Sequence, residues 1–236
     1  MRWIAVIGLC VLSGCVTTGA APQGPAQPKA SAVEQPAAPT RADVDRFVSV
    51  AKTVEPVSER VCRQQTGPGT NCDFKIVVDD RPGQPVNAYQ TLDRSGRPII
   101  AFTLPMLAAV RNSDELAFVM GHEAAHHIAG HIPRQQQNAM AGAILLGGLA
   151  TISGAGADVV RTAQDLGASV GARSYSKEFE LEADALGTVI AKRSGFDPVR
   201  GAAFFSRIPD PGDRFLGTHP PNAQRIETVR RVNSRL

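Results

Sequence analysis

The sequence predicts an α+β fold that is mostly helical, with a small antiparallel sheet beside one central helix. Three short runs rich in β-branched and apolar residues are bounded by turn residues, which is typical of strands. Before and after these runs, apolar residues recur at the spacing of amphipathic helices. The predicted strands cover residues 74–78, 88–92 and 98–103.

Residues 1–14 have the features of a bacterial secretory signal. The apolar run Ile4–Leu12 follows a basic start and is shorter than the roughly 20 residues that span a bilayer. The small residues before Cys15 resemble a lipobox, in which the cysteine receives acyl chains. We therefore expect a lipid anchor at Cys15, and Val16 after it predicts export to the periplasmic side of the bacterial outer membrane. The alternative is an ordinary secreted protein with a chance cysteine.

Residues 15–40 are predicted to be a tether between this anchor and the folded part of the chain. The segment is rich in proline and alanine, has no aromatic residue, and carries only Lys29 and Glu34 as charges. Such a segment cannot bury enough apolar surface to fold. We therefore expect residues 41–236 to form a single folded domain.

Composition and cysteine usage narrow the possible partners and compartments. The formal net charge of +3 is small, and no basic cluster is interleaved with aromatic residues, so nucleic acid is not an expected partner. No pattern in the sequence predicts an oligomeric state. Beyond the signal and the anchor, Cys62 and Cys72 form an even pair that could close a short loop as a disulfide in an oxidising compartment.

The first helix is predicted from about Arg41 to Cys62. Pro56 interrupts its pattern, so we expect either one helix with a break or two shorter helices. Of the three strands, 98–103 comes closest before the central helix. We expect it to be the edge strand that an extended peptide can join through its free backbone groups.

The central helix carries the pattern His-Glu-x-x-His, and Asn112 or Ser113 can cap its start. His122 and His126 are one helical turn apart, so both imidazoles can reach a single metal ion. Glu123 lies beside that point, where its carboxylate can take a proton from water. The alternative is a surface helix that happens to carry two histidines. The apolar stripe that runs into the motif favours the metal site, because unpartnered polar groups are costly to bury.

The uncharged segment Gln135–Ala157 follows the motif helix. Its apolar part is too short for a membrane span, and its glycines weaken a helix. We expect a helical hairpin that is buried or covers the active site. A loop that dips into a membrane or binds a partner is the alternative.

A helix predicted over Ala168–Arg193 carries four carboxylates. Glu180 and Asp184 are one turn apart and could face a common point, as the two motif histidines do. Glu178 and Glu182 are expected to lie on a solvated face. Further on, Phe204, Phe205 and Ile208 have the spacing of core residues, and a last helix starts near Asn222.

Four elements in this order resemble the gluzincin metallopeptidase family that includes HtpX and the CAAX prenyl endopeptidases, and in particular its periplasmic lipoprotein members. The resemblance covers roughly residues 74–230. Its elements are Asn87-Ala88, Asp114-Glu115-Leu116-Ala117 ahead of the HExxH motif, Glu180-Leu181-Glu182-Ala183-Asp184 with Gly187, and Thr218-His219-Pro220 with Arg225. Lys177 stands where the family usually has arginine.

The resemblance implies one zinc ion per chain in a gluzincin metallopeptidase domain. Its implied ligands are His122, His126 and Glu180, and Glu123 is the implied general base. Asp184 would orient a ligand histidine. His219 would be a fourth ligand or an oxyanion donor, and Arg225 is the other candidate for oxyanion donor. The longer zinc-protease pattern HExxHxxGxxH fails at Ala129 and Ile132. His131 is therefore expected to be structural or exposed.

Together these features predict a zinc-dependent endopeptidase that hydrolyses misfolded or misassembled cell-envelope proteins. Three protein ligands leave one metal position open, as in catalytic zinc sites. The alternative is a chaperone-like or scaffold lipoprotein of the periplasm with a latent metal site. Glu123 favours the enzyme, because a protein without activity would be free to lose it. A purely structural zinc site is a weaker possibility, since it would more often use cysteines.

Overall fold

The computed structural model describes residues 38–174, 176–210, 212 and 219–236. The expected signal peptide, the expected lipidation at Cys15, most of the expected tether, and Thr218 lie outside these described residues. The chain folds into a mostly helical α+β structure with one three-stranded sheet, which confirms the predicted fold class.

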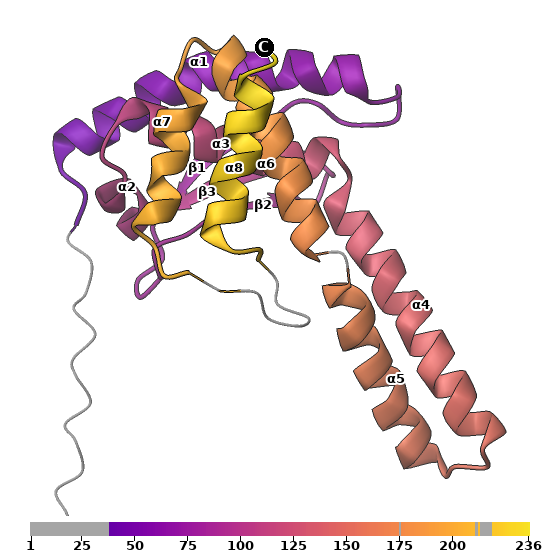
Figure 1. Ribbon diagram of the computed structural model, residues 1–236. Coiled ribbons are helices and arrows are strands. Elements are labelled where there is room, and N and C mark those ends of the chain that lie inside the picture. Colours follow the sequence, from indigo (N-terminus) through magenta and orange to yellow (C-terminus); the bar gives the residue numbers. More distant parts are fainter. Residues whose placement is uncertain (1–37, 175, 211, 213–218) are drawn as a thin grey trace, which may run out of the picture. The chain divides into compact units, whose positions relative to one another are not determined.

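In chain order the elements are α1 (Arg41–Gln65), β1 (Lys75–Asp79), β2 (Ala88–Leu92), β3 (Pro98–Thr103), α2 (Leu104–Ala109), α3 (Ser113–Ile128), α4 (His131–Ile152), α5 (Ala157–Arg173), α6 (Ser176–Arg193), α7 (Pro198–Ala202), the 3₁₀ turn η1 (Ala203–Ser206) and α8 (Asn222–Asn233). Helices α1, α6 and α7 pack against the central helix α3, whereas the pair α4 and α5 extends away from the sheet (Figure 1).

The sheet has the strand order β1-β3-β2, and it is mixed rather than wholly antiparallel. β3 pairs in parallel with β1 and antiparallel with β2. The prediction that residues 98–103 form the edge strand is therefore wrong, because β3 is the central strand. Its side chains are almost all buried, as a strand with neighbours on both sides requires, whereas β2 is half-buried or exposed. The edge strand nearest the motif helix is β2.

Helix α1 is continuous through Pro56, so the predicted break is absent. Proline removes one helical hydrogen bond, but Pro56 lies on the exposed face, where the unbonded carbonyl one turn earlier can be hydrated. The opposite face holds the helix against the core through Val54, Val57 and Val61. Thr40 caps the helix in a reciprocal capping box with Asp43.

Helix α3 is buried along nearly its whole length. Leu116, Phe118 and Met120 have no exposed surface, and they pack in one core with residues such as Phe102 of β3 and Val54 of α1. The motif histidines therefore stand on a helix that is held by the sheet and by the surrounding helices. Such a rigid support suits a site whose ligand atoms must be placed to a fraction of an ångström.

Helices α4 and α5 form the predicted helical hairpin, but its outer part is not buried (Figure 1). The pair packs closely through glycines, since a Cβ on Gly142 would lie 2.0 Å from the Gly167 carbonyl oxygen. Two helices alone can bury only the faces that they share. Large apolar side chains therefore remain exposed: Met140, Ile144, Leu145, Leu149 and Ile152 on α4, and Val159 and Leu166 on α5.

The expected helix over 168–193 is two helices, because α5 ends at Arg173 and α6 begins at Ser176. Ser174 has an extended backbone with ψ of 133°, which ends α5. α6 then carries the carboxylates toward the motif helix. Within the described part of the chain, no helix combines the length and the apolar character needed to cross a membrane.

Candidate metal centre

The start of α3 is fixed by a cap and by a buried ion pair. Asn112 accepts a hydrogen bond from the backbone N–H of Glu115 at 3.0 Å, which confirms one of the two predicted caps. The Glu115 carboxylate is itself buried and receives both terminal nitrogens of Arg207, at 2.6 and 2.8 Å. Because both partners of this bidentate pair are satisfied, the pair ties the first turn of α3 to the end of η1.

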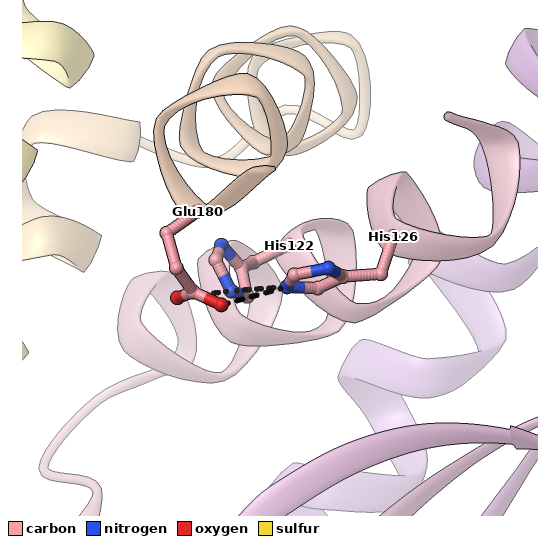
Figure 2. Close-up of side chains that lie close together, drawn as sticks. All are labelled: His122, His126 and Glu180. Atoms are coloured by element: carbon pink, nitrogen blue, oxygen red, sulfur yellow. Dashed lines mark hydrogen bonds and ion pairs between the residues drawn. The ribbon is translucent and has the colours of Figure 1, made fainter. Parts of the chain in front are cut away.

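Three side chains from two helices converge at one point, as Figure 2 shows. The Nε2 atoms of His122 and His126 on α3 are 3.0 Å apart. Glu180 on α6 places Oε2 at 3.5 Å from Nε2 of His122 and Oε1 at 3.4 Å from Nε2 of His126. One donor atom from each residue lies within 4.8 Å of the others, so these three residues could hold a metal ion.

Two glycines allow α3 and α6 to approach closely enough for this convergence. A Cβ on Gly187 would lie 2.8 Å from the backbone nitrogen of His122, and a Cβ on Gly121 would lie 2.9 Å from the Gly187 carbonyl oxygen. Real Cβ atoms do not approach backbone this closely, so a larger residue would force the helices apart. The helix crossing at these glycines sets the distance from Glu180 to the histidines.

Asp184 is fully buried one turn beyond Glu180, and it bonds to the far side of the His122 ring. Its Oδ1 lies 3.0 Å from Nδ1 of His122. Arg225 on α8 donates to both carboxylate oxygens of Asp184, at 2.7 and 2.8 Å, and its guanidinium stacks 3.8 Å over the Phe205 ring. Asp184 is thus held from two sides, and it can orient a ring whose other nitrogen faces the metal point.

The electrostatics of this cluster favour a cation. Burial would raise the pKa of Glu180, but hydrogen bonds from His122, His126 and His219 hold that pKa well below its ordinary value. Burial would likewise raise the pKa of Asp184, and bonds from Arg225 and His122 lower it. Burial alone would lower the pKa of His122, but its bonds with Asp184 and Glu180 raise that pKa to about 10. The two carboxylates therefore carry negative charge, and a divalent metal that binds here must displace the proton from the metal-facing nitrogen of His122.

The convergence point opens into a cleft of about 680 Å³. Edge strand β2 forms one part of its lining with Ala88, Tyr89 and Gln90, and Glu123 of the motif faces the same space. His219 also lines the cleft. Its side chain is 53% exposed, and its Nδ1 lies 3.2 Å from Oε2 of Glu180. All the residues predicted to bind metal or act in catalysis therefore line this cleft or contact a residue that does.

His131 is part of this cluster, although the sequence pattern offered it only as structural or exposed. It is buried, and its Nδ1 lies 2.8 Å from Nδ1 of His126. Gly130 makes the contact possible, because its left-handed φ of 65° ends α3 and lets the chain turn into α4. In the sequence, the signal for this contact is Gly130, a turn residue directly before His131 and just after the motif.

Glu182 differs from the expectation of a purely solvated carboxylate. Although half of its side chain is exposed, it accepts hydrogen bonds from Arg134 at 2.8 Å and from His131 at 3.1 Å. Away from the cleft, a disulfide with Cα atoms 5.7 Å apart joins Cys62, near the end of α1, to Cys72 in the connection that leads to β1.

Comparison with known proteins agrees with this arrangement. The sequence model of peptidase family M48 matches residues 49–233, which includes every described residue of the metal centre. The chain is also similar to the "Beta-barrel assembly-enhancing protease" of Escherichia coli O157:H7, with 32% identity over 135 residues, or 50% of this chain and 27% of the relative.

Two further relatives are mitochondrial. The "Mitochondrial metalloendopeptidase OMA1" of Saccharomyces cerevisiae is 30% identical over 163 residues, covering 65% of this chain and 45% of the relative. The protein of the same name from Arabidopsis thaliana is 27% identical over 139 residues, or 57% of this chain and 27% of the relative. The chain thus spans between about a quarter and a half of the length of these relatives.

Proposed function

Because the chain belongs to peptidase family M48, we propose that it is a zinc-dependent endopeptidase. The observation that carries the proposal is the convergence of His122, His126 and Glu180 in a cleft that also contains Glu123 and an edge strand. A structural metal site needs neither a neighbouring carboxylate base nor an open groove. A hydrolytic site needs both.

The chemistry of the donor set fits zinc. Two imidazole nitrogens and one carboxylate oxygen are the ligands of the catalytic His₂Glu zinc sites. The two histidine Nε2 atoms lie 3.0 Å apart, and different oxygens of Glu180 lie 3.5 Å from the first and 3.4 Å from the second. When bound, zinc supplies Lewis acidity that polarises a peptide carbonyl and makes water more acidic.

The chain's own residues perform the proton transfers and hold the geometry. Glu123 accepts a proton from the attacking water and returns it to the leaving amine, the role of a general base and acid. His219 lies beside Glu180 at the cleft and donates a hydrogen bond to the developing oxyanion. Arg225 donates its hydrogen bonds to Asp184, and it thereby holds the Asp184 carboxylate against His122.

The cleft is suited to an extended, partly apolar polypeptide. The free edge of β2 offers backbone groups for strand addition, and the Tyr89 hydroxyl is tied to Asp79 at 2.9 Å, which steadies this edge. Phe179, Phe205 and Ile132 contribute apolar surface to the lining. Unfolded or misassembled proteins present such segments and folded proteins conceal them, so we infer that they are the substrates.

We propose that the substrates are cell-envelope proteins and that the enzyme works at the periplasmic face of the outer membrane. The expected lipid anchor at Cys15 supports this location, as does the name of the bacterial relative, an assembly-enhancing protease for β-barrels. The disulfide between Cys62 and Cys72 also suits an oxidising compartment. Labelling with a radioactive fatty acid, with and without Cys15→Ser, tests the anchor.

The experiment that tests the activity compares the full-length wild type with Glu123→Gln, purified in detergent. Zinc per chain and cleavage of casein, an unfolded protein, are measured for both. We expect about one zinc in both proteins and cleavage by the wild type alone. Glu178→Gln, an exposed glutamate of α6, is the matched control and should cleave normally.

Two other outcomes contradict the proposal. Wild type that binds zinc but leaves casein intact supports the alternative, a scaffold or chaperone-like lipoprotein with a latent metal site. Wild type that binds no zinc refutes the metal centre itself.

A further inference from the structure

Four side chains join the base of the α4–α5 hairpin to the start of α6, and we call them the root clamp: His131 and Arg134 of α4, and Phe179 and Glu182 of α6. The His131 ring stacks on the Phe179 ring, with 4.5 Å between centroids and 11° between planes. The Arg134 guanidinium lies 4.4 Å from the Phe179 centroid. Both α4 residues also donate to the Glu182 carboxylate, at 3.1 and 2.8 Å.

The root clamp contacts the metal centre on the α3 side through His126. The His126 ring has its Nε2 at the convergence point, 3.0 Å from Nε2 of His122, and its Nδ1 on the opposite edge, 2.8 Å from Nδ1 of His131. The chain of contacts therefore runs from His126 to His131, then to Glu182, and it ends at Arg134. Each ring nitrogen along it has a partner.

On the α6 side, the root clamp is connected to the metal centre because its residues are close neighbours of Glu180 in the sequence. Phe179 directly precedes Glu180, and Glu182 lies two residues after Glu180. These two residues of the root clamp therefore lie on either side of Glu180 in the sequence. Phe179 is buried, and its ring contacts both the His131 ring and the Arg134 guanidinium. These contacts restrain the start of α6 directly before Glu180.

We propose that the root clamp positions two metal-binding side chains, His126 through a hydrogen bond and Glu180 through the start of α6. The inference rests on the proposed function, since it assumes that these side chains bind zinc. His131 is a positioning residue in this scheme and does not touch the metal. Asp184 and Arg225 hold His122 in the same way, so each ligand histidine has its own supporting pair.

The physical reason is the freedom of an unsupported imidazole. A histidine that binds a metal through one nitrogen usually has its other nitrogen held by a hydrogen-bond partner, which sets the ring orientation and the tautomer. Removing that partner typically weakens metal binding by about 10–100-fold. His126 is partly exposed to the cleft, so no packed wall replaces His131 if the hydrogen bond is lost.

If the root clamp only attached the hairpin to the domain, breaking it would not change zinc affinity. If it positions His126 and Glu180, breaking it would weaken zinc binding. His131→Phe keeps a ring against Phe179 but removes the bond to His126. His131→Asn places an amide near the former Nδ1, so it can restore that bond. His127→Phe is the matched control, because His127 follows the ligand directly and bonds instead to the Asn71 carbonyl at 2.7 Å.

The experiment uses the full-length protein in detergent and measures the zinc dissociation constant by competition with a chromophoric chelator. The absorption spectrum of the cobalt-loaded protein reports the ligand geometry. We expect His131→Phe to weaken zinc binding at least 10-fold and to change the cobalt spectrum. His131→Asn should recover most of the affinity, and His127→Phe should stay within about 3-fold of wild type.

A second variant tests the clamp if His131→Phe does not fold. Glu182→Ala removes a half-exposed carboxylate and should weaken zinc binding several-fold, whereas Glu178→Ala on the same helix should not. The inference is overturned if folded His131→Phe binds zinc within 3-fold of wild type. If His131→Phe does not fold, the same result for Glu182→Ala overturns it. If such variants also cleave casein normally, the proposed function stands and only the positioning role fails. A wild type that binds no zinc overturns both.

Discussion

Oδ1 of Asp184 lies 3.0 Å from Nδ1 of His122, and this contact joins a fully buried carboxylate to the ring at the centre of the metal cluster. Arg225 compensates the charge of that carboxylate from the other side with two hydrogen bonds. The three residues come from α6, α3 and α8. The metal point is therefore assembled only when these helices have packed, which links metal affinity to folding.

Asp184→Asn tests this link. The amide can still bond to His122, but it cannot neutralise Arg225, so a buried cation loses its partner. We expect zinc affinity to fall at least 10-fold and the free energy of unfolding to fall by about 3 kcal/mol, the usual scale for one partner of a buried pair. Chelator competition and urea unfolding measure the two effects. Asp165→Asn on the exposed face of α5 is the control, and a matching loss there would show that the effect is not specific.

Gly187→Ala tests the helix crossing that brings Glu180 to the histidines. The added Cβ would lie 2.8 and 2.9 Å from backbone atoms of His122, so α3 and α6 must separate. We expect a loss of about 1–3 kcal/mol in the free energy of unfolding and weaker zinc binding. Thermal unfolding and chelator competition follow both quantities.

Gly148→Ala on α4 is the control for that substitution, because its Cβ would meet no atom within 4 Å. Alanine has the higher helix propensity, so this variant should be slightly more stable than wild type and bind zinc equally well. If Gly187→Ala behaves like Gly148→Ala, the close crossing does not set the ligand distances.

Zinc itself should stabilise the fold. Any ligand that binds only the native state adds RT ln(1 + [L]/Kd), or about 2.7 kcal/mol when zinc is present at 100 times its dissociation constant. We expect the unfolding temperature to rise with zinc and to fall after treatment with a chelator. His126→Ala should lose this dependence, while His127→Ala keeps it. A wild type whose unfolding temperature ignores zinc would contradict a bound metal in the native state.

Local patterns predicted the elements of this fold well, but not how they pair. The strands β2 and β3 begin and end at the predicted residues, because turn residues on each side mark their ends. The pairing of β1 with β3 depends on contacts between distant segments, which short-range patterns do not encode. For that reason the predicted edge position of residues 98–103 is wrong, and this strand is central.

The same limit applies to the candidate site. His122 and His126 share one helix, so their common point follows from helical spacing alone. Glu180 entered through a family motif, and only the structure shows the helix crossing that brings it within reach. The contact of His131 with His126 depends on a left-handed glycine between two helices, and helical periodicity ends at that point. The exposed apolar face of α4 also escaped prediction, since periodicity does not reveal whether a neighbour covers a helix.

The last prediction concerns acid and the edge strand β2. Asp79 accepts hydrogen bonds from Arg81 at 2.7 and 2.8 Å and from the Tyr89 hydroxyl, and the bonds from Arg81 lower its pKa far below the ordinary 3.8. Because the folded-state pKa is the lower one, the stability that Asp79 contributes is complete above pH 4–5, where the unfolded chain is also ionised. This contribution is lost as pH falls below that range toward the folded-state pKa.

Asp79→Asn should therefore lower the free energy of unfolding at pH 7. It should also make that free energy depend less on pH in the acid range. Urea unfolding of wild type and variant between pH 2 and pH 7 measures the difference, which should shrink as the pH falls. Asp80→Asn, at the exposed next residue, should leave the profile unchanged. A difference between wild type and Asp79→Asn that stays constant down to pH 2 would mean that the charge of Asp79 does not hold this edge, and that Tyr89 is fixed by packing instead.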